Sequence, residues 1–294
     1  IQSIIDVNFV ETENFNSKNI IAFGNNQQES GAFAIAPGSL PNSSDVFIGV
    51  LDDGSFQIPT RDDFQYANVF IHEIGHALGL KHPFEDPSPS GKVATPPYLV
   101  GDENNAVWTQ MSYSGSNKSF EFSPLDIAAL QYVYGVPNTA NAGDTRYVYD
   151  ETRSNFIWDG FGNDTIDASN SSEPVTIFLE PGFHGFKGLT KIYKPITSPG
   201  QITVNFGTEI ENLIGSNFSD LLTGNNLDNI LTGGRGSDII DGMTGIDTAV
   251  YELDRGLAVV TLSRDDVWNV GSESDIDSLK SIERLKFNDI NVAL

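Results

Sequence analysis

Residues 215–250 read GSNFSDLLT, GNNLDNILT, GGRGSDIID and GMTGIDTAV, four consecutive segments of nine residues. Each segment opens with a glycine and carries an aspartate or asparagine at its sixth position, ahead of a short apolar run. Because glycine, asparagine and aspartate tolerate the positive φ of tight turns, we expect six residues of each segment to turn and three to form a strand. The residues expected to point inward from these strands are Leu222, Leu231, Ile240 and Ala249.

These nine-residue segments resemble the calcium-binding repeat GGxGxDxUx of RTX proteins, which folds as a parallel β-roll. Only the third segment matches fully, because Phe218 and Leu227 each replace a glycine and Asn229 replaces an aspartate. Turns of this kind bind Ca²⁺ through carbonyl and carboxylate oxygens. The residues expected at the calcium sites are Gly215, Asn217, Asp220, Gly224, Asn226, Asn229, Gly233, Gly234, Gly236, Asp238, Gly242, Gly245 and Asp247.

The RTX resemblance also implies two segments per coil, so that turns eighteen residues apart stack and share an ion. This arrangement pairs Asp220 with Asp238, and Asn229 with Asp247. The second pairing has one charge fewer than the first. We therefore expect it to bind calcium more weakly.

A separate stretch, DGFGNDTID at 159–167, resembles a further calcium turn at the start of the C-terminal domain of such proteins. Its candidate ligands are Asp159, Gly160, Gly162 and Asp164. An ordinary hairpin turn rich in aspartate and asparagine is the alternative for a motif that stands alone.

The chain is strongly acidic, with 40 Asp and Glu residues against 16 Lys and Arg residues and a net charge of −24. Such a charge repels nucleic acid and anionic membranes, and it favours divalent cations as partners. The sequence contains no cysteine, so bound metal is the expected substitute for disulfides outside the cell. No apolar run reaches the length of a membrane span.

Carboxylates crowded into the turns repel one another until Ca²⁺ neutralises them, and extracellular modules bind it with a Kd of about 10⁻⁴–10⁻³ M. We therefore expect the roll to be unfolded in a low-calcium cytosol and to fold outside the cell. The resemblance implies type I secretion, in which the secretion machinery recognises an uncleaved C-terminal signal. The ending SIERLKFNDINVAL at 281–294 resembles the terminal segment of many RTX proteins, and it equally fits a plain amphipathic strand.

Upstream of the repeats, residues 1–58 alternate short apolar runs with clusters of Asn, Gly, Ser and Pro, which predicts strands joined by loops. The runs are VNFV at 7–10, IIAFG at 20–24, GAFAIAP at 31–37 and DVFIGVL at 45–51. A helix is expected over residues 61–78, with Thr60 as its N-cap and Gly79 at its end.

A second helix is expected to begin with Ser123 as N-cap, Pro124 at its first position and Asp126 completing a capping box. It should end at Gly135. Beyond it, strand-like runs follow one another and no convincing helix appears. We therefore expect an α+β domain over residues 1–135 and an all-β domain, a parallel β-roll or sandwich, over residues 136–294.

Residues 72–82 read HEIGHALGLKH and fit the pattern HExxHxxGxxH. On a helix, His72 and His76 lie on one face with their Cβ atoms about 5–6 Å apart. Gly79 can adopt the positive φ that ends the helix, and the returning chain then brings His82 round as a third ligand. Three neutral nitrogens leave one tetrahedral position open, which is typical of a catalytic Zn²⁺ site.

Glu73 lies beside the same helix face, within reach of a zinc-bound water. Zinc lowers the pKa of that water towards about 7, and Glu73 could accept its proton and later protonate the leaving amine. These steps would hydrolyse a peptide bond without a covalent enzyme intermediate. An amphipathic core helix that happens to contain histidines is one alternative. A non-catalytic zinc site is another, and it would leave Glu73 and Gly79 unexplained.

The motif resembles the metzincin superfamily of zinc peptidases and, within it, the serralysins, which are secreted bacterial proteases. The resemblance continues at Met111, Ser112 and Tyr113, which are similar to the serralysin Met-turn. It implies that Met111 is structural and lies under the zinc site, and that Tyr113 is both a zinc ligand and a stabiliser of the oxyanion. It further implies a metzincin-like fold and a secreted metalloendopeptidase.

Residues 123–135 are similar to the helix that closes the serralysin catalytic domain, and the runs at 31–38 and 45–50 to strands beside its substrate cleft. A peptide that adds to a sheet edge is held by main-chain hydrogen bonds, so broad specificity for protein or peptide substrates is implied. A proteinaceous inhibitor is a further expected partner, and the chain is expected to be a monomer. The rival interpretations are a binding or adhesion module and a zinc hydrolase that acts on something other than peptides.

Serralysin-like catalytic domains have a strand and most of a long helix before the segment that resembles VNFVE, whereas only residues 1–5 precede it here. A sheet without that strand would leave backbone donors and acceptors unpaired. We therefore expect these 294 residues to be part of a longer polypeptide. The alternative is a reduced catalytic domain whose sheet edge is covered in another way.

Overall fold

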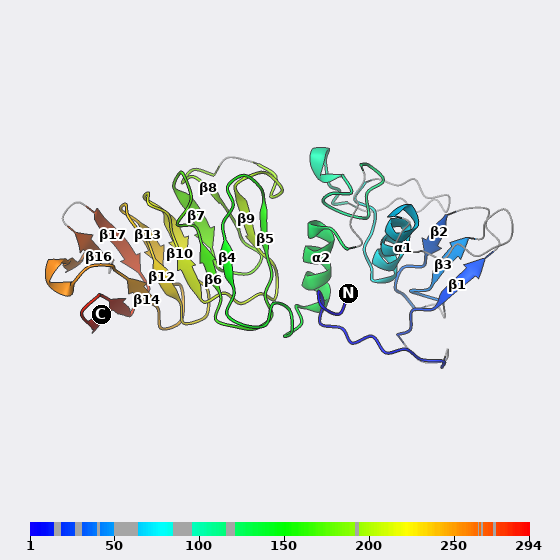
Figure 1. Cartoon of the computed structure of the whole chain (residues 1–294), viewed down its shortest axis with the longest axis horizontal. Helices are drawn as coiled ribbons and strands as arrows, with labels where there is room; N and C mark the ends of the chain where they lie inside the picture. The colour runs from blue at the N-terminus through cyan, green and yellow to red at the C-terminus, as the bar shows by residue number, and fades with distance from the viewer. Residues whose placement is uncertain are drawn as a thin grey trace. The chain divides into compact units, whose positions relative to one another are not determined.

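The computed structural model places the chain in two compact units (Figure 1). It describes residues 1–14, 19–26, 31–39, 42–49, 64–84, 96–115, 121–191, 194–263, 265, 267–272 and 275–294. Gln2 and residues 7–134 form the N-terminal unit, whereas Ile1, residues 3–6 and residues 135–294 form the C-terminal unit. The grouping of residues 3–6 differs from the expected domain 1–135. It arises because Ile5 is buried and Asp6 donates its backbone N–H to the carbonyl of Gly135 over 3.1 Å.

A small sheet in the N-terminal unit contains the strands β1 (Phe23–Asn26), β2 (Ala32–Ala34) and β3 (Val46–Gly49). Their order is β1-β3-β2, with β1 parallel to β3 and β2 antiparallel to it. The expectation of a strand at 7–10 was wrong, since these residues form none. Val10 is 73% exposed there, and no described strand pairs with this run, which an isolated strand would need for stability.

The helix α1 (Phe64–Ala77) carries the first two motif histidines and packs against β2 and β3. The expected cap Thr60 and the expected first turn at 61–63 lie outside the described residues. The helix ends as predicted at Gly79, which has a φ of +101°. The N–H groups of Gly79 and Leu80 donate to the carbonyls of His76 and Gly75, both over 2.9 Å, which is the Schellman arrangement.

The helix α2 (Pro124–Tyr134) follows the short 3-10 helix η1 (Gly101–Glu103). One half of the expected capping box is present, because the Asp126 carboxylate accepts the N–H of Ser123 over 3.1 Å. The Ser123 hydroxyl instead donates to the carbonyl of Ala106 over 2.8 Å. Gly135, with a φ of +80°, follows the helix. In the described part of the chain no helix is long and apolar enough to cross a membrane.

The C-terminal unit is built from short strands that follow one another along two sheets (Figure 1). The strands are β4 (Arg146–Val148), β5 (Asn155–Ile157), β6 (Thr165–Asp167), β7 (Val175–Phe178), β8 (His184–Lys187), β9 (Gln201–Val204), β10 (Asn212–Ile214), β11 (Leu221–Thr223), β12 (Ile230–Thr232), β13 (Ile239–Asp241), β14 (Thr248–Val250), β15 (Val259–Leu262), β16 (Trp268–Ser272), β17 (Asp275–Lys280), β18 (Arg284–Lys286) and β19 (Asn291–Ala293). One sheet has the order β19-β18-β14-β12-β10-β6-β4, and the other β15-β16-β17-β13-β11-β7-β8-β9-β5. A 3-10 turn, η2 (Arg255–Leu257), is the only helical element described in this unit.

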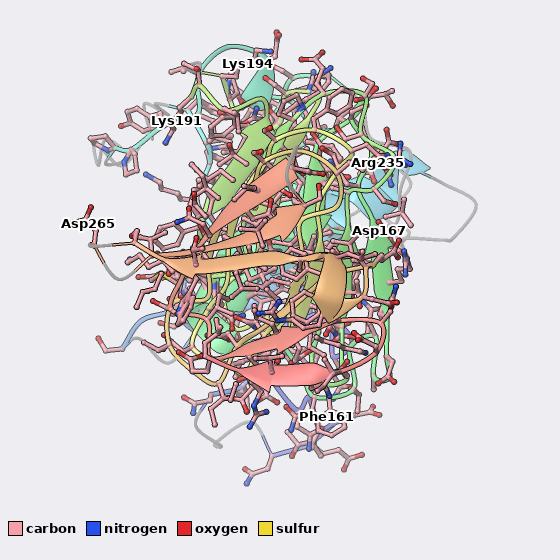
Figure 2. All side chains as sticks on the ribbon, turned by 90° about the vertical axis from the view of Figure 1, so that its left-hand side faces the viewer. Phe161, Asp167, Lys191, Lys194, Arg235 and Asp265 are labelled. Carbon is pink, nitrogen blue, oxygen red and sulfur yellow. The ribbon has the colours of Figure 1, made fainter. Side chains whose placement is uncertain are left out.

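Strands of the repeats pair in parallel with partners eighteen residues away, as the two-segment coil predicts. Leu222 lies opposite Ile240, and Leu231 opposite Ala249. All four side chains are buried, with at most 1% of their surface exposed. Figure 2 views this unit from its C-terminal end and shows Arg235, from the exposed turn of the third segment, at the outer rim. The nine-residue period therefore predicted both the register and the inward face.

Candidate metal centres

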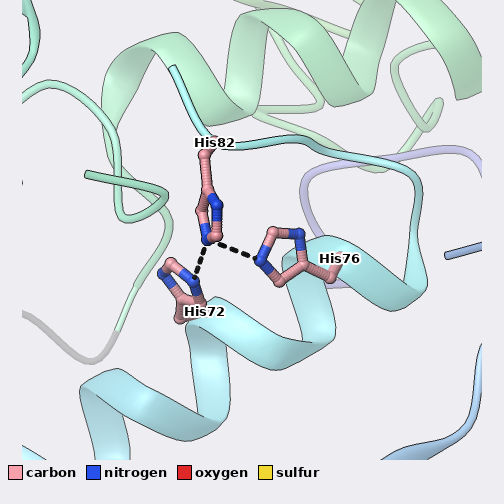
Figure 3. A group of neighbouring side chains, drawn as sticks. All are labelled: His72, His76 and His82. Atoms are coloured by element: carbon pink, nitrogen blue, oxygen red, sulfur yellow. Dashed lines mark hydrogen bonds between the residues drawn. The ribbon is translucent and has the colours of Figure 1, made fainter. Parts of the chain in front are cut away.

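Three imidazoles converge on one point in the N-terminal unit (Figure 3). His72 and His76 stand one turn apart on α1, and His82 comes from the segment after the helix. The Nε2 atoms of His72 and His76 lie 3.2 and 3.0 Å from the Nε2 atom of His82. Two nitrogens bound to one zinc ion at about 2.0–2.1 Å in tetrahedral geometry are about 3.3 Å apart, so these distances fit zinc.

Backbone carbonyls orient two of the three rings. The Nδ1 atom of His72 lies 2.7 Å from the carbonyl oxygen of Gln110, and that of His76 lies 2.8 Å from the carbonyl oxygen of Leu80. Because a carbonyl only accepts, each Nδ1 carries the proton and each Nε2 keeps a lone pair for a metal. Burial also lowers the pKa of His72, which favours the neutral, ligating form.

Met111 packs beneath the histidine-bearing turn of α1, with only 2% of its surface exposed. A Cβ atom added to Gly75, between the two helical histidines, would lie 2.6 Å from the Met111 sulfur. The glycine thus allows the methionine to approach the helix backbone. This contact is consistent with the structural place expected for Met111.

Glu73 follows His72 on α1 and is buried, with 6% of its surface exposed. Burial raises the pKa of its carboxyl group to about 7, and a hydrogen bond from the backbone of Ala34 on β2 opposes the rise. A divalent cation at the histidines would also lower this pKa, since it favours the carboxylate. A carboxyl group whose pKa lies near neutrality is suited to accept and return a proton.

Tyr113 reaches the histidines although 69% of its surface is exposed. Its hydroxyl oxygen lies 2.9 Å from the Nε2 atom of His82. Its ring is also stacked on that of His72, with centroids 5.5 Å apart and planes at 26°. The structure therefore brings the phenol to the point where the three imidazoles meet.

In the C-terminal unit, the paired turns of the repeats meet as the eighteen-residue spacing predicts. The N–H of Asp220 donates to Oδ1 of Asp238, and the N–H of Asn229 donates to Oδ1 of Asp247, both over 2.7 Å. The second oxygen, Oδ2, of Asp238 and of Asp247 is buried without a hydrogen-bond partner in the described part of the chain. Burial and neighbouring carboxylates raise the pKa of Asp238 to about 8. Buried, unpaired carboxylate oxygens fit Ca²⁺, which takes hard oxygen ligands.

Comparison with known proteins agrees with both centres. Residues 17–139 match the Metallo-peptidase family M12B, Reprolysin-like, and residues 148–171 and 214–249 match the RTX calcium-binding nonapeptide repeat. Serralysin B from Dickeya chrysanthemi is 32% identical over 224 residues, 68% of this chain and 44% of that relative. A serralysin from Photorhabdus laumondii is 32% identical over 250 residues, 74% of this chain and 49% of the relative. The chain is a serralysin-type metalloprotease homologue with RTX repeats.

This serralysin-type chain spans about half the length of the curated relatives it matches. Metalloprotease AprA from Pseudomonas entomophila, for example, is 32% identical over 235 residues, 69% of this chain and 46% of the relative. The matches imply zinc in the N-terminal unit and calcium in the repeats. The histidine cluster and the buried aspartates fit these two metals, and the fold is that of a metzincin domain followed by a β-roll.

The geometry of the histidine cluster also depends on Asp126, for which the sequence predicted only a role in capping α2. Its carboxylate accepts the hydroxyl of Thr109 and the N–H of Gln110, each over 2.6 Å. Gln110 is the residue whose carbonyl orients His72. The first turn of α2 thus holds the loop that orients the imidazole of His72. The only signal in the sequence was the acidic residue of the capping box.

The acidic columns of the roll extend beyond the four repeats. The N–H of Asp238 donates to Asp277, and the N–H of Asp247 donates to Glu283, both over 2.8 Å. At the other end, the N–H of Asp164 donates to Glu211 over 2.7 Å. Sequence reasoning missed Asp277 and Glu283 because they lie 39 and 36 residues after their partners. It missed Glu211 because this residue precedes the first nine-residue segment, although its strand pairs with β12 at a spacing of eighteen. A usable signal was present, since Glu211 and Glu283 directly precede three-residue strands, as the aspartates of the repeats do.

The turn at 159–164 lies within the same column and is not an isolated hairpin. Its strand β6 pairs in parallel with β10 of the roll, and residues 148–171 match the RTX repeat. Asp164 accepts the N–H of Thr145 over 2.8 Å, and Asp159 accepts the hydroxyl of Tyr147. A Cβ atom at Gly162 would lie 2.4 Å from the carbonyl oxygen of Gly143, so the stacking of the turns requires glycine there.

Proposed function

We propose that this chain is a secreted zinc endopeptidase. The observation that carries the proposal is the convergence of the Nε2 atoms of His72, His76 and His82, together with the burial of Glu73, which follows His72 on α1. A zinc ion held there would polarise a substrate carbonyl and lower the pKa of a bound water to about 7. The remaining steps fall to side chains of the protein.

Glu73 is the general base of the proposed reaction. Its buried carboxylate accepts the proton of the attacking water and then delivers it to the leaving amine. Tyr113, whose hydroxyl lies at the histidines, donates a hydrogen bond to the oxyanion that develops on the substrate. The first role is supported by the burial of Glu73, the residue after His72 on α1, and the second by the distance of the Tyr113 hydroxyl from His82.

Peptides are the favoured substrate because β2, next to the site, is an end strand of the sheet formed by the described residues. It is the last strand in the order β1-β3-β2 of the described sheet, and Ala34 on it contacts Glu73 through its backbone. An extended peptide can add to such an edge through main-chain hydrogen bonds, which read the backbone more than the side chains. We therefore propose broad specificity for protein and peptide substrates.

We assign the roll to folding and export. Carboxylates aligned in columns oppose folding until calcium binds, so the unit would remain unfolded in the cytosol and fold outside the cell, where it would stabilise the enzyme. That behaviour suits type I secretion. We also propose that the enzyme is a monomer and that a proteinaceous inhibitor is one of its partners.

The main rival is a binding module in which zinc is only structural. Such a module needs three ligands but has no use for a buried carboxyl group beside them or for a phenol at the fourth side. The positions of Glu73 and Tyr113 therefore favour catalysis. A hydrolase for other substrates would share this chemistry. The place of β2 at the end of the described sheet favours peptides as the substrate.

Hydrolysis of casein by the wild type and by Glu73→Ala tests the proposed activity. We expect the variant to keep about one zinc ion per chain, because all three imidazoles remain, and to lose at least about 10³-fold in kcat/KM. Glu11→Ala, which removes an exposed glutamate of the same unit, is the matched control and should keep full activity. A zinc-loaded Glu73→Ala with wild-type activity would refute the mechanism, and an inactive, zinc-loaded wild type would favour the binding module.

A further inference from the structure

Phe84 lies two residues after the last motif histidine and is not part of the pattern HExxHxxGxxH. It is half-buried, and its ring is stacked on that of His82 with centroids 5.0 Å apart and planes at 6°. A parallel ring at this distance restricts rotation of the imidazole about its bond to Cβ. Phe84 therefore holds the plane in which the Nε2 atom of His82 faces the other two histidines.

The same phenylalanine contacts Tyr113. The two ring centroids are 5.0 Å apart with planes at 55°, and Tyr113 also packs edge-on against His82 at 4.7 Å. Although Tyr113 is largely exposed, aromatic rings thus surround it on the side of the metal site. One side chain touches both a metal ligand and the phenol that the proposed reaction uses.

We propose that Phe84 is a positioning residue that fixes the His82 ring and keeps the Tyr113 hydroxyl at the metal. The role rests on the proposed function for its use in catalysis, but its effect on the metal centre is independent of peptidase activity. Each aromatic contact of this kind contributes modestly, so removing both should change metal binding by about fivefold to about 50-fold. The loss should appear in the metal centre and not in the fold.

Copper provides a readout of the tyrosine. With Cu²⁺ in place of zinc, a phenolate at the metal gives a charge-transfer absorption, and the part of it that Tyr113→Phe abolishes reports Tyr113. We expect Phe84→Ala to weaken this band per bound copper and to speed zinc dissociation about fivefold or more. Phe84→Leu keeps most of the volume and tests the ring alone if the alanine variant is poorly folded. Phe84→Tyr keeps an aromatic ring, so its copper band and its zinc dissociation rate should be close to those of the wild type.

Phe23→Ala is the matched control, since Phe23 makes a comparable ring contact, 5.5 Å to Phe70 on α1, in the same unit. It should leave the copper band and the zinc dissociation rate unchanged. Wild-type values for both readouts in Phe84→Ala and Phe84→Leu, or equal losses in Phe23→Ala, would overturn the proposal. A copper band that Tyr113→Phe leaves intact would overturn the Tyr113 half, and zinc dissociation would then decide the His82 half. A wild type that lacks peptidase activity yet shows Phe84-dependent metal readouts would refute the proposed function and leave this role in place.

Discussion

Backbone carbonyls engage the Nδ1 atoms of His72 and His76, and that engagement decides which ring nitrogen is free for metal. The two carbonyls come from different places. Leu80 belongs to the turn that ends α1, whereas Gln110 belongs to a loop thirty-eight residues after His72. The orientation of the two imidazoles therefore depends on residues that contact them only through backbone atoms, an arrangement that is usual for histidines that bind metal.

Tyr113→Phe is expected to lower kcat by about 100-fold while KM changes little, because the hydroxyl would bind chiefly the oxyanion of the transition state. The ring contacts with His72 and His82 remain in this variant, so zinc content should not fall. Steady-state kinetics on a peptide substrate, with zinc measured in parallel, provide the check. An unchanged kcat would remove Tyr113 from the reaction.

At the scale of elements, hydrogen bonds join the first turn of α2 to the loop before it. The Leu125 N–H donates to the carbonyl of Trp108, and Asp126 accepts from Thr109, Gln110 and Ser123. Burial raises the pKa of Asp126 to about 6 in spite of these donors. These hydrogen bonds fix the loop that carries Met111 and Tyr113 to the first turn of α2.

Asp126→Ala should destabilise the N-terminal unit by about 2–4 kcal/mol, since it leaves buried donors without an acceptor. It should also speed hydrogen exchange at residues 105–115 and zinc release, because Gln110 would no longer be held against His72. The exposed Asp102 of η1 gives the control, and Asp102→Ala should stay within about 0.5 kcal/mol of wild type. Equal urea midpoints for both variants would contradict the role assigned to Asp126.

The turns at Asp220, Asn229, Asp238 and Asp247 each donate a backbone N–H to a carboxylate of the next turn in their column. The side chains at the equivalent position of successive turns differ in charge. Oδ2 of Asp238 has no partner among the described residues, whereas the Asn229 amide donates to the side chain of Asn225 over 3.0 Å. Calcium should therefore bind more strongly at Asp238 than at Asn229, because a free carboxylate oxygen is the better ligand.

Asp238→Ala is therefore expected to weaken calcium binding more than Asn229→Ala, by about tenfold in midpoint, or about 1.4 kcal/mol. The physical reason is that the first change removes a charged ligand and the second a neutral one. Circular dichroism of the β signal, followed as calcium is added, measures both midpoints. Identical midpoints would refute the pairing of Asp220 with Asp238 as the stronger site.

At the scale of the whole molecule, buried carboxylates of the C-terminal unit lie in the columns of the roll, where bound metal could neutralise them. Burial together with neighbouring carboxylates raises the pKa of Asp238 to about 8, and those of Asp247 and Asp277 to about 6, from an ordinary value of 3.8. An acid whose pKa is higher in the folded state holds its proton more tightly there than in the unfolded chain. Without calcium, the stability that these protons contribute is present at low pH and is lost as pH rises through about 4–8.

Protonation should therefore substitute in part for calcium. We expect the calcium-free C-terminal unit to keep more β structure and a higher Tm at pH 5 than at pH 8, and calcium to remove most of that difference. Thermal melts followed by circular dichroism, with chelator or with calcium, measure this directly. Asp238→Asn is the control and should flatten the pH dependence without calcium, whereas a higher Tm at pH 8 in wild type would contradict the assignment.

The features that the sequence determined by itself are those with a fixed spacing. Residues four apart on a helix share a face, and a glycine with positive φ reverses the chain, so HExxHxxGxxH was enough to place His72, His76 and His82 together. The nine-residue period likewise determined the stacking of Leu222 on Ile240 and of Asp220 on Asp238. The alternation of apolar runs with turn residues was a less reliable predictor of strands, since the run at 7–10 forms none.

Only the tertiary structure decided the surroundings of these sites. Asp126 holds Gln110, Phe84 touches Tyr113, and Asp277 continues the column of Asp238, each through a contact between segments whose separation follows no helical or nine-residue repeat. Within a helix or a regular repeat, the spacing along the sequence determines which side chains lie on the same face. A sequence pattern can therefore specify which candidate ligands face one another. The contacts that hold those ligands depend on how distant elements pack, and no spacing encodes that.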